Sequence, residues 1–173
     1  MSHALIPGSF DPMTLGHLNI IKRALSHYDK VTVAVMINDQ KTYLHTLEQR
    51  AEMARLTLAG LSNVEVITDE GMLVDLFDRI GADVIVKGIR NEADRIYEEK
   101  MAAYNIAKNP RAKTVFLQAA DDYETVNSTS VRELLAKGKM PSDLVAPNVV
   151  EYLASLGAKK RTASGASYVQ QQA

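Results

Sequence analysis

The sequence contains no cysteine among its 173 residues. This absence excludes disulfide bonds, thiolate metal sites and a thiol nucleophile together. The chain also lacks any apolar run close to the roughly 18 residues that a membrane-spanning helix needs. It enters the apolar segment Ala4–Ile6 without a preceding basic region, which argues against a signal peptide. We therefore expect a cytoplasmic protein with no membrane partner.

The chain also carries no large net charge of either sign. The formal net charge is −1, from 20 basic and 21 acidic residues, so no global charge indicates a nucleic-acid partner. Local basic groups can still hold a small anionic ligand. The chain is 46% hydrophobic and 24% charged, which is typical of a globular protein, and its length suits one domain.

Short β-branched runs alternate with helical patterns along the chain. Strands are expected at Ala4–Ile6, Val31–Ile37, Val64–Ile67, Val84–Val86 and Thr114–Leu117. Helices are expected at His17–Tyr28, Leu47–Leu58, Met72–Ile80 and Glu92–Lys108, with two or three short ones after Ser130, including one near Pro147–Leu156. Continuous apolar runs suit strands buried on both faces of a parallel sheet. The alternation predicts a doubly wound α/β fold with a five-stranded parallel sheet, which binds ligands at the carboxyl ends of its strands.

Two features help to place the boundaries. Thr46 followed by Gln49 predicts a capping box at the start of the second helix. A single domain is expected over residues 1–157. The remaining segment, residues 158–173, contains Lys159-Lys160-Arg161 and then becomes rich in Ser, Ala and Gln, and we expect it to be disordered.

The segment between the first strand and the first helix reads Pro7-Gly8-Ser9-Phe10-Asp11-Pro12-Met13-Thr14-Leu15-Gly16-His17. Gly8 permits close backbone approach to a ligand. Gly16 and His17 fall at a helix N-terminus, where free N–H groups and the helix dipole favour phosphate. An imidazole there can donate to a phosphoryl oxygen as its charge grows in the transition state; a turn with a capping histidine is the alternative. Three other histidines lack this context and are expected at the surface: His3, His27 and His45.

Basic side chains also lie at the ends of the second and fourth predicted strands. Lys41 comes after the second strand, and a lysine there can meet a phosphate as a mobile point charge. Lys87-Gly88-Ile89-Arg90 ends the fourth strand, and two cations that flank a glycine at such a point are well placed for phosphates. Taken alone, these residues are more typical of solvated surface charges beside a turn glycine than of a phosphate site.

Small hydroxyl residues follow the fifth strand, within Tyr123-Glu124-Thr125-Val126-Asn127-Ser128-Thr129. Hydroxyls and backbone N–H groups at a helix start can both bind phosphates. Ser130 with Glu133 predicts a capping box, so Ser130 is interpreted as structural.

Together these motifs resemble those of the phosphopantetheine adenylyltransferases, within the nucleotidyltransferase superfamily. Thr14–His17 matches the T/H-x-G-H motif, and Pro7–Pro12 matches the P-G-T/S-F-D-P opening; the resemblance extends from Ala4 to Leu156. Class I aminoacyl-tRNA synthetases carry a related motif, so T/H-x-G-H by itself indicates the superfamily. The resemblance implies a Rossmann-like enzyme that transfers the adenylyl group of ATP to 4′-phosphopantetheine, giving dephospho-coenzyme A and pyrophosphate.

The resemblance also implies roles for individual residues, with His17 as the transition-state stabiliser. The phosphopantetheine side comprises Ser9, Lys41, Leu73, Lys87 and Asn105. The ATP side comprises Ser9, Phe10, His17, Gly88, Ile89, Arg90, Glu98, Tyr123, Glu124, Thr125, Val126, Asn127, Ser128 and Thr129. Mg²⁺ is expected to arrive with ATP, held mainly by phosphate oxygens and water rather than by protein ligands. A homohexamer built as a dimer of trimers is implied.

The chain departs from the family pattern at several of these positions. Lys87 stands where an arginine is commoner, which keeps the charge and loses the bidentate fork. Two groups of replacements adjoin implied ATP ligands: Arg95 and Ile96 before Tyr97-Glu98, and Glu124, Thr125 and Asn127 in the hydroxyl segment. Leu73 is carried over to the pantetheine channel, whereas the side chain of Met72 is expected in the core. Asn105 has a helix-surface amide as its alternative interpretation.

Three other functions compete with this one. A nicotinate mononucleotide adenylyltransferase shares the Gly-x-x-His pattern and a serine/threonine loop, but the chain length, Lys41 and Lys87–Arg90 favour phosphopantetheine. A cytidylyltransferase is disfavoured because its R-T-x-G-I-S-T-T loop is absent. A catalytically silent nucleotide-binding module is disfavoured by His17.

Overall fold

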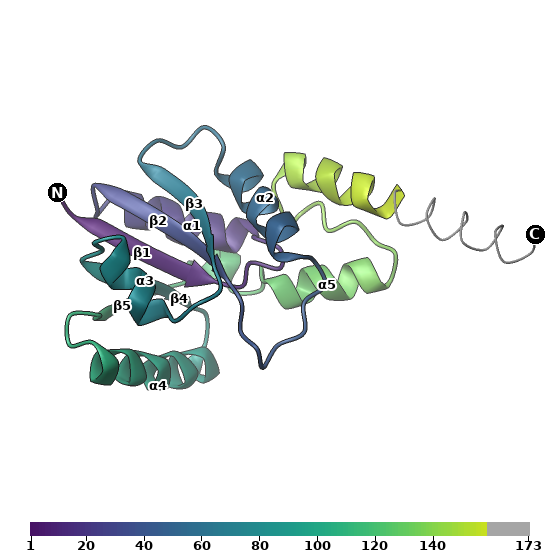
Figure 1. Cartoon of the computed structure of the whole chain (residues 1–173). Helices are drawn as coiled ribbons and strands as arrows, with labels where there is room; N and C mark the ends of the chain where they lie inside the picture. Colours follow the sequence, from purple (N-terminus) through teal and green to yellow (C-terminus); the bar gives the residue numbers. More distant parts are fainter. Residues whose placement is uncertain (159–173) are drawn as a thin grey trace, which may run out of the picture.

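The computed structural model describes residues 1–158 and contains a five-stranded, all-parallel sheet with helices on both faces (Figure 1). The strands are β1 (His3–Gly8), β2 (Lys30–Met36), β3 (Val64–Asp69), β4 (Val84–Ile89) and β5 (Thr114–Gln118). The helices are α1 (Leu15–Leu25), α2 (Leu47–Leu58), α3 (Leu73–Arg79), α4 (Glu92–Lys108), the short 3₁₀ turn η1 (Asp121–Tyr123) and α5 (Ser128–Ala136). Residues 147–158 are also helical. The predicted doubly wound α/β fold is confirmed.

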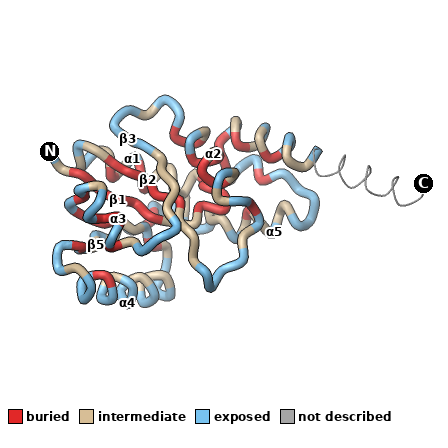
Figure 2. The backbone as a smooth tube through the Cα atoms, viewed as in Figure 1, coloured by how far each residue is buried: buried red, intermediate tan, exposed pale blue. Residues whose placement is uncertain are grey.

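Each face of the sheet is covered by a different set of helices. On one face, Ile21 and Ala24 of α1 and Ala51 and Ala54 of α2 pack against the central strands. On the other, α3 inserts Phe77, which is fully buried. A third cluster joins α2 to α5 and the helix at 147–158, which lie beyond the carboxyl end of β1 (Figure 1). By contrast, α4 is mostly exposed (Figure 2).

Helix starts follow the local capping chemistry. The predicted capping box at Thr46 and Gln49 is confirmed. The first helix begins at Leu15, two residues before the predicted start, because Thr14 is its N-cap and accepts from the His17 N–H. The predicted cap at Ser130 is wrong: α5 starts at Ser128, and Asn127 is the N-cap that accepts from the Ser130 N–H at 2.9 Å.

Other sequence expectations need correction. Met72 precedes α3 as its N-cap and is 45% exposed, so its side chain does not pack in the core. His3 and His45 are both buried at 8% exposure, since His3 Nε2 hydrogen bonds Thr32 Oγ1 at 2.7 Å and His45 pairs with Asp11. The expected disordered segment 158–173 lies outside the described residues except for Ala158, which is helical. Within residues 1–158, no helix combines the length and apolarity that crossing a membrane requires.

The strand order β3-β2-β1-β4-β5 places a switch point between β1 and β4. β1 pairs with β2 along its whole length, up to Gly8 opposite Val35. Its pairing with β4 ends at Leu5 opposite Ile85. The carboxyl halves of β1 and β4 therefore separate, and a crevice opens where doubly wound sheets bind ligands.

Candidate active site

A cavity of about 350 Å³ lies at this crevice, and a second of about 550 Å³ adjoins it. The first reaches from the β1–α1 segment to α4 and the start of α5. The second extends between the ends of β2 and β4, the start of α3 and one side of α4. Seven residues line both cavities and form a shared wall: Pro7, Gly8, Ser9, Lys41, Lys87, Tyr97 and Glu98. Two ligands bound in the two cavities would meet at this wall.

His17 stands in the first cavity with a defined ring orientation. Its Nδ1 accepts a hydrogen bond from the Thr14 backbone N–H at 3.0 Å. Phe10 packs edge-on against the imidazole, with ring centroids 5.0 Å apart. Phe10 adopts a left-handed φ of 47°, and a Cβ at position 8 would lie 2.8 Å from its Cζ, so the close approach that Gly8 permits is to this ring. Because Nδ1 is an acceptor, the proton of neutral His17 lies on Nε2.

Burial, together with the positive charges of Arg90 and Lys87, lowers the pKa of His17 from 6.5 to about 4, and burial is the largest of these causes. The imidazole is therefore neutral at physiological pH. A neutral imidazole with its proton on Nε2 is a hydrogen-bond donor that keeps its protonation state while the reaction proceeds.

This tautomer can be checked directly. In ¹⁵N-edited NMR spectra we expect His17 as the neutral Nε2–H form with no titration down to about pH 5, since protonation waits until the pH falls through about 4. The unfolded chain takes up this proton already near 6.5, so His17 should lower the free energy of unfolding progressively from there to about 4. Titration of the His17 ring near 6.5 in the folded protein would contradict the assignment.

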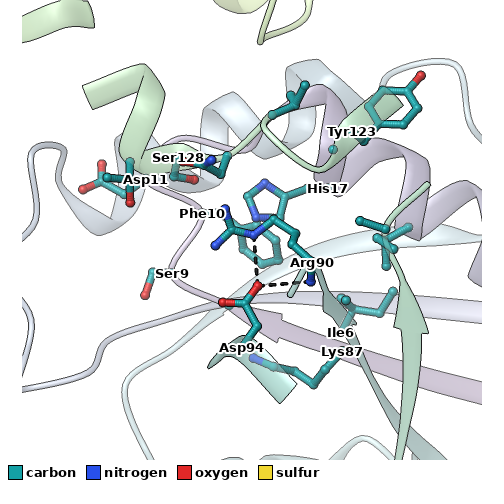
Figure 3. Close-up of a pocket in the computed structure, with 18 of the residues that line it drawn as sticks. Ile6, Ser9, Phe10, Asp11, His17, Lys87, Arg90, Asp94, Tyr123 and Ser128 are labelled. Atoms are coloured by element: carbon teal, nitrogen blue, oxygen red, sulfur yellow. Dashed lines mark hydrogen bonds and ion pairs between the residues drawn. The ribbon is translucent and has the colours of Figure 1, made fainter. Parts of the chain in front are cut away.

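The two cations of the β4 end are each paired with a carboxylate. Arg90 donates to Asp94 Oδ2 from both its backbone N and its Nε, each at 3.1 Å. Figure 3 shows the Arg90 side chain between Asp94 and the rings of Phe10 and His17. Lys87 Nζ lies 3.4 Å from Glu98 Oε1. Both cations are thus held in place within the cavity by charged partners on α4.

Close backbone contact brings the hydroxyl segment to the first helix. A Cβ at Gly16 would lie 2.5 Å from the Val126 carbonyl oxygen, so only glycine fits there. Ser128 Oγ donates to the Pro12 carbonyl at 2.7 Å. The first N–H groups of α5 consequently lie beside the start of α1, and two helix N-termini border one cavity.

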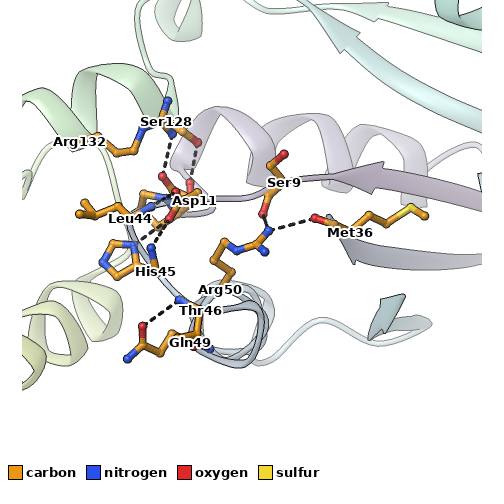
Figure 4. A network of polar contacts seen from close by, with 11 residues as sticks. Ser9, Asp11, Met36, Leu44, His45, Thr46, Gln49, Arg50, Ser128 and Arg132 are labelled. Atoms are coloured by element: carbon orange, nitrogen blue, oxygen red, sulfur yellow. Dashed lines mark hydrogen bonds and ion pairs between the residues drawn. The ribbon is translucent and has the colours of Figure 1, made fainter. Parts of the chain in front are cut away.

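A polar network centred on the buried Asp11 side chain holds together the segments that border the first cavity (Figure 4). The Asp11 carboxylate, 2% exposed, accepts from Leu44 N at 2.7 Å and from His45 Nδ1 at 2.8 Å. Burial alone would raise the pKa of Asp11, but the hydrogen bonds from His45 and Leu44 outweigh it and hold the pKa below its usual value. Arg132 donates to the Asp11 carbonyl at 2.9 Å and to Thr129 Oγ1 at 3.2 Å. The network ties the β1–α1 segment to the β2–α2 segment and to α5.

Most residues implied by the family resemblance lie around these cavities. The first is lined by Ser9, Phe10, His17, Lys41, Lys87, Gly88, Arg90, Glu98, Tyr123, Val126, Asn127, Ser128 and Thr129. The second is lined by Leu73 and Asn105, along with the shared wall. Asn105 is 7% exposed, so it is not a helix-surface amide. Three implied ATP ligands line neither cavity: Ile89, which is 1% exposed in the sheet, Glu124 and Thr125.

Several residues that form hydrogen bonds or ion pairs with the predicted site residues were not identified from the sequence. Asp94 lies in the first turn of α4, four positions after Arg90, which precedes the N-cap Asn91; this short separation was visible in the sequence. Arg132 follows Thr129 by one helical turn and could have been found in the same way. The contacts of Tyr43 with Ser9 and of Asp11 with His45 gave no such signal, because each joins residues 34 positions apart.

Residues 5–134 match the family model described as cytidylyltransferase-like. A chain from Vibrio parahaemolyticus described as a nicotinate-nucleotide adenylyltransferase superposes with a TM-score of 0.68, covering 90% of this chain and 93% of that one. It is 24% identical, so the similarity shows the shared fold. Fold and site together define a nucleotidyltransferase of the cytidylyltransferase-like family.

Closer relatives narrow this class. A phosphopantetheine adenylyltransferase of Limosilactobacillus reuteri (strain DSM 20016) is 42% identical over 153 residues, which is 88% of each chain. One from Clostridium botulinum (strain 657 / Type Ba4) is 41% identical over 150 residues, covering 87% of this chain and 92% of that one. The chain belongs to the phosphopantetheine adenylyltransferase family.

Proposed function

We propose that this enzyme transfers the adenylyl group of ATP to 4′-phosphopantetheine, releasing pyrophosphate and forming dephospho-coenzyme A. The observation that carries the proposal is the wall shared by the two cavities. Ser9, Lys41 and Lys87 line both cavities, so two phosphate-bearing substrates can meet there with their negative charges neutralised.

The reaction needs little covalent help from the protein. A phosphate monoester oxygen of phosphopantetheine, already ionised near neutral pH, attacks the α-phosphorus of ATP. The new P–O bond forms as the bond between the α-phosphorus and the bridging oxygen breaks, and pyrophosphate leaves with the bonding electrons. Catalysis then rests on positioning and on stabilising charge at the α-phosphoryl group.

We assign each side chain of the cavity a role from its position. His17 donates from Nε2 to the α-phosphoryl oxygen. Arg90 holds the ATP phosphates, and Lys41 and Lys87 hold the phosphopantetheine phosphate. Ser9 donates its hydroxyl proton where the two phosphates meet. This assignment is supported by the common cavity, by the fixed Nδ1 of His17 and by the strand-end position of the cations.

Mg²⁺ is proposed to enter with ATP, held by phosphate oxygens and water. Three carboxylates line the first cavity, and each already has partners: Asp11 in the buried network, Asp94 with Arg90, and Glu98 with Lys87. Within residues 1–158, no cluster of three acidic or histidine side chains offers a ready-made metal site. The ion would neutralise phosphate charge when bound.

The proposal extends to assembly and location. Helix α4 exposes apolar side chains along its length: Ile96, Tyr97, Met101, Tyr104 and Ile106. A run of this kind supports burial against other copies of the chain, in the homohexamer that the family resemblance implies. A cytoplasmic location accords with a role in coenzyme A biosynthesis.

Parallel assays test substrate identity. We expect pyrophosphate release from ATP with 4′-phosphopantetheine, dependent on Mg²⁺, and none above background with nicotinate mononucleotide. Mass spectrometry of the products should show dephospho-coenzyme A. Adenylylation of nicotinate mononucleotide in place of phosphopantetheine would show the substrate assignment to be wrong. Release with neither acceptor, from folded protein that binds ATP, would favour the silent nucleotide-binding module.

A further inference from the structure

Tyr43 lies behind the shared wall, in the segment between β2 and α2. Its hydroxyl oxygen is 3.3 Å from Ser9 Oγ, although the two residues are 34 positions apart. Ser9 lines both cavities, whereas Tyr43 lines neither. Tyr43 therefore reaches the reacting groups through Ser9.

The hydrogen bonds around the phenol favour one direction of donation. The Asn38 backbone N–H donates to the Tyr43 oxygen at 2.7 Å, so that oxygen is already an acceptor. The phenol proton has two acceptors within reach, Ser9 Oγ at 3.3 Å and the Asn38 carbonyl at 3.5 Å. A phenol is a stronger acid than an aliphatic hydroxyl, and donation to Ser9 Oγ is the shorter contact. The Ser9 proton then remains free to point into the cavity.

The ring is held so that this contact can persist. The Arg50 guanidinium carbon lies 3.9 Å from the centroid of the Tyr43 ring. Arg50 is 1% exposed, and its Nη1 donates to the Ser9 carbonyl at 2.7 Å and to the Met36 carbonyl at 3.0 Å (Figure 4). The same arginine thus fixes the backbone of Ser9 and the ring whose hydroxyl contacts the Ser9 side chain.

Tyr43 also closes a turn that carries a second phosphate-binding candidate. Lys41 N donates to the Asn38 carbonyl at 2.9 Å, and Gln40 N donates to Asn38 Oδ1 at 2.9 Å. Since Asn38 N is bound to Tyr43, loss of the phenol hydroxyl could act through this turn as well as through Ser9. The test must separate the two routes.

We propose that Tyr43 is a positioning residue that accepts from Asn38, donates to Ser9 Oγ, and so directs the Ser9 hydroxyl proton toward the phosphopantetheine phosphate. The inference rests on the proposed function, because it takes phosphopantetheine as the ligand at the shared wall. Ser9 is the group that touches the substrate, and Tyr43 sets which way its proton points.

Tyr43→Phe removes the hydroxyl and keeps the ring under Arg50. We expect KM for phosphopantetheine to rise roughly three- to tenfold, the size of one hydrogen bond, with KM for ATP changed less than about twofold and an unchanged melting temperature. Tyr28→Phe is the matched control, since Tyr28 is a partly buried tyrosine packed against the core under α1 and should leave both KM values as they are.

Double mutants show whether Tyr43 acts through Ser9 or through the turn that carries Lys41. In Ser9→Ala, adding Tyr43→Phe should have no further effect; in Lys41→Ala, it should raise KM for phosphopantetheine by the same factor as in the wild type. The reverse pattern would assign Tyr43 to the Lys41 turn and overturn the proposal, as would an unchanged KM in Tyr43→Phe. Wild-type turnover of phosphopantetheine, measured alongside, separates these outcomes from a failure of the proposed function.

Discussion

His17→Ala is expected to lower kcat by about 10²–10³ while changing the KM values for both substrates only a few-fold. The imidazole is neutral, its proton lies on Nε2, and the Thr14 N–H holds the ring in orientation. A donor preorganised in this way contributes mainly where charge grows, in the transition state. Its removal should therefore affect turnover far more than binding.

His27→Ala is the matched control, because His27 is exposed and outside both cavities. Its kcat should equal that of the wild type. Retention of kcat within a few-fold in His17→Ala would remove His17 from the mechanism. Binding of ATP by the folded variant, measured by calorimetry, distinguishes lost chemistry from a collapsed site.

Lys87→Ala should raise KM for phosphopantetheine by roughly tenfold to over a hundredfold, and KM for ATP far less. Loss of one charge-assisted hydrogen bond to phosphate costs about 1.5–3 kcal/mol, which corresponds to that range. The ammonium lies in the shared wall, paired with Glu98 at 3.4 Å. When the phosphate binds, we expect it to replace Glu98 as the partner of the Lys87 ammonium. Steady-state kinetics with each substrate varied in turn measures the two KM values.

Two further variants sharpen the result. Lys87→Arg should retain a low KM for phosphopantetheine if the wall accommodates the longer planar group. Lys100→Ala, an exposed lysine of the same charge on α4, should change neither KM. An unchanged KM for phosphopantetheine in folded Lys87→Ala would leave Lys41 and Ser9 as the groups that hold the phosphate.

The sheet and its order of elements were accessible from sequence because each buried strand is a continuous apolar run. The start of α2 was equally accessible, since Thr46 and Gln49 lie three residues apart and cap each other locally. The start of α5 was not, because Asn127 and Ser130 are both good caps and only the packed structure decides between them.

For the site, sequence motifs located the segments but not their contacts. The positions of His17 and Arg90 followed from strand ends and a helix start, which the alternating pattern predicts. The burial of His45 did not, because its partner Asp11 lies 34 positions away and no periodicity relates them. Ile89 stays a prediction: its side chain is 1% exposed, so a contact with ATP would have to come from its backbone.

The early end of the β1–β4 ladder has a consequence for how far the residues around the site can change. The crevice results from strand order and register, not from the particular side chains around it, so its existence is independent of what it binds. Residues at its rim can be exchanged without rebuilding the scaffold. The chain from Vibrio parahaemolyticus keeps the same fold at 24% identity. A fold of this kind therefore tolerates extensive change in sequence while its strand order stays the same.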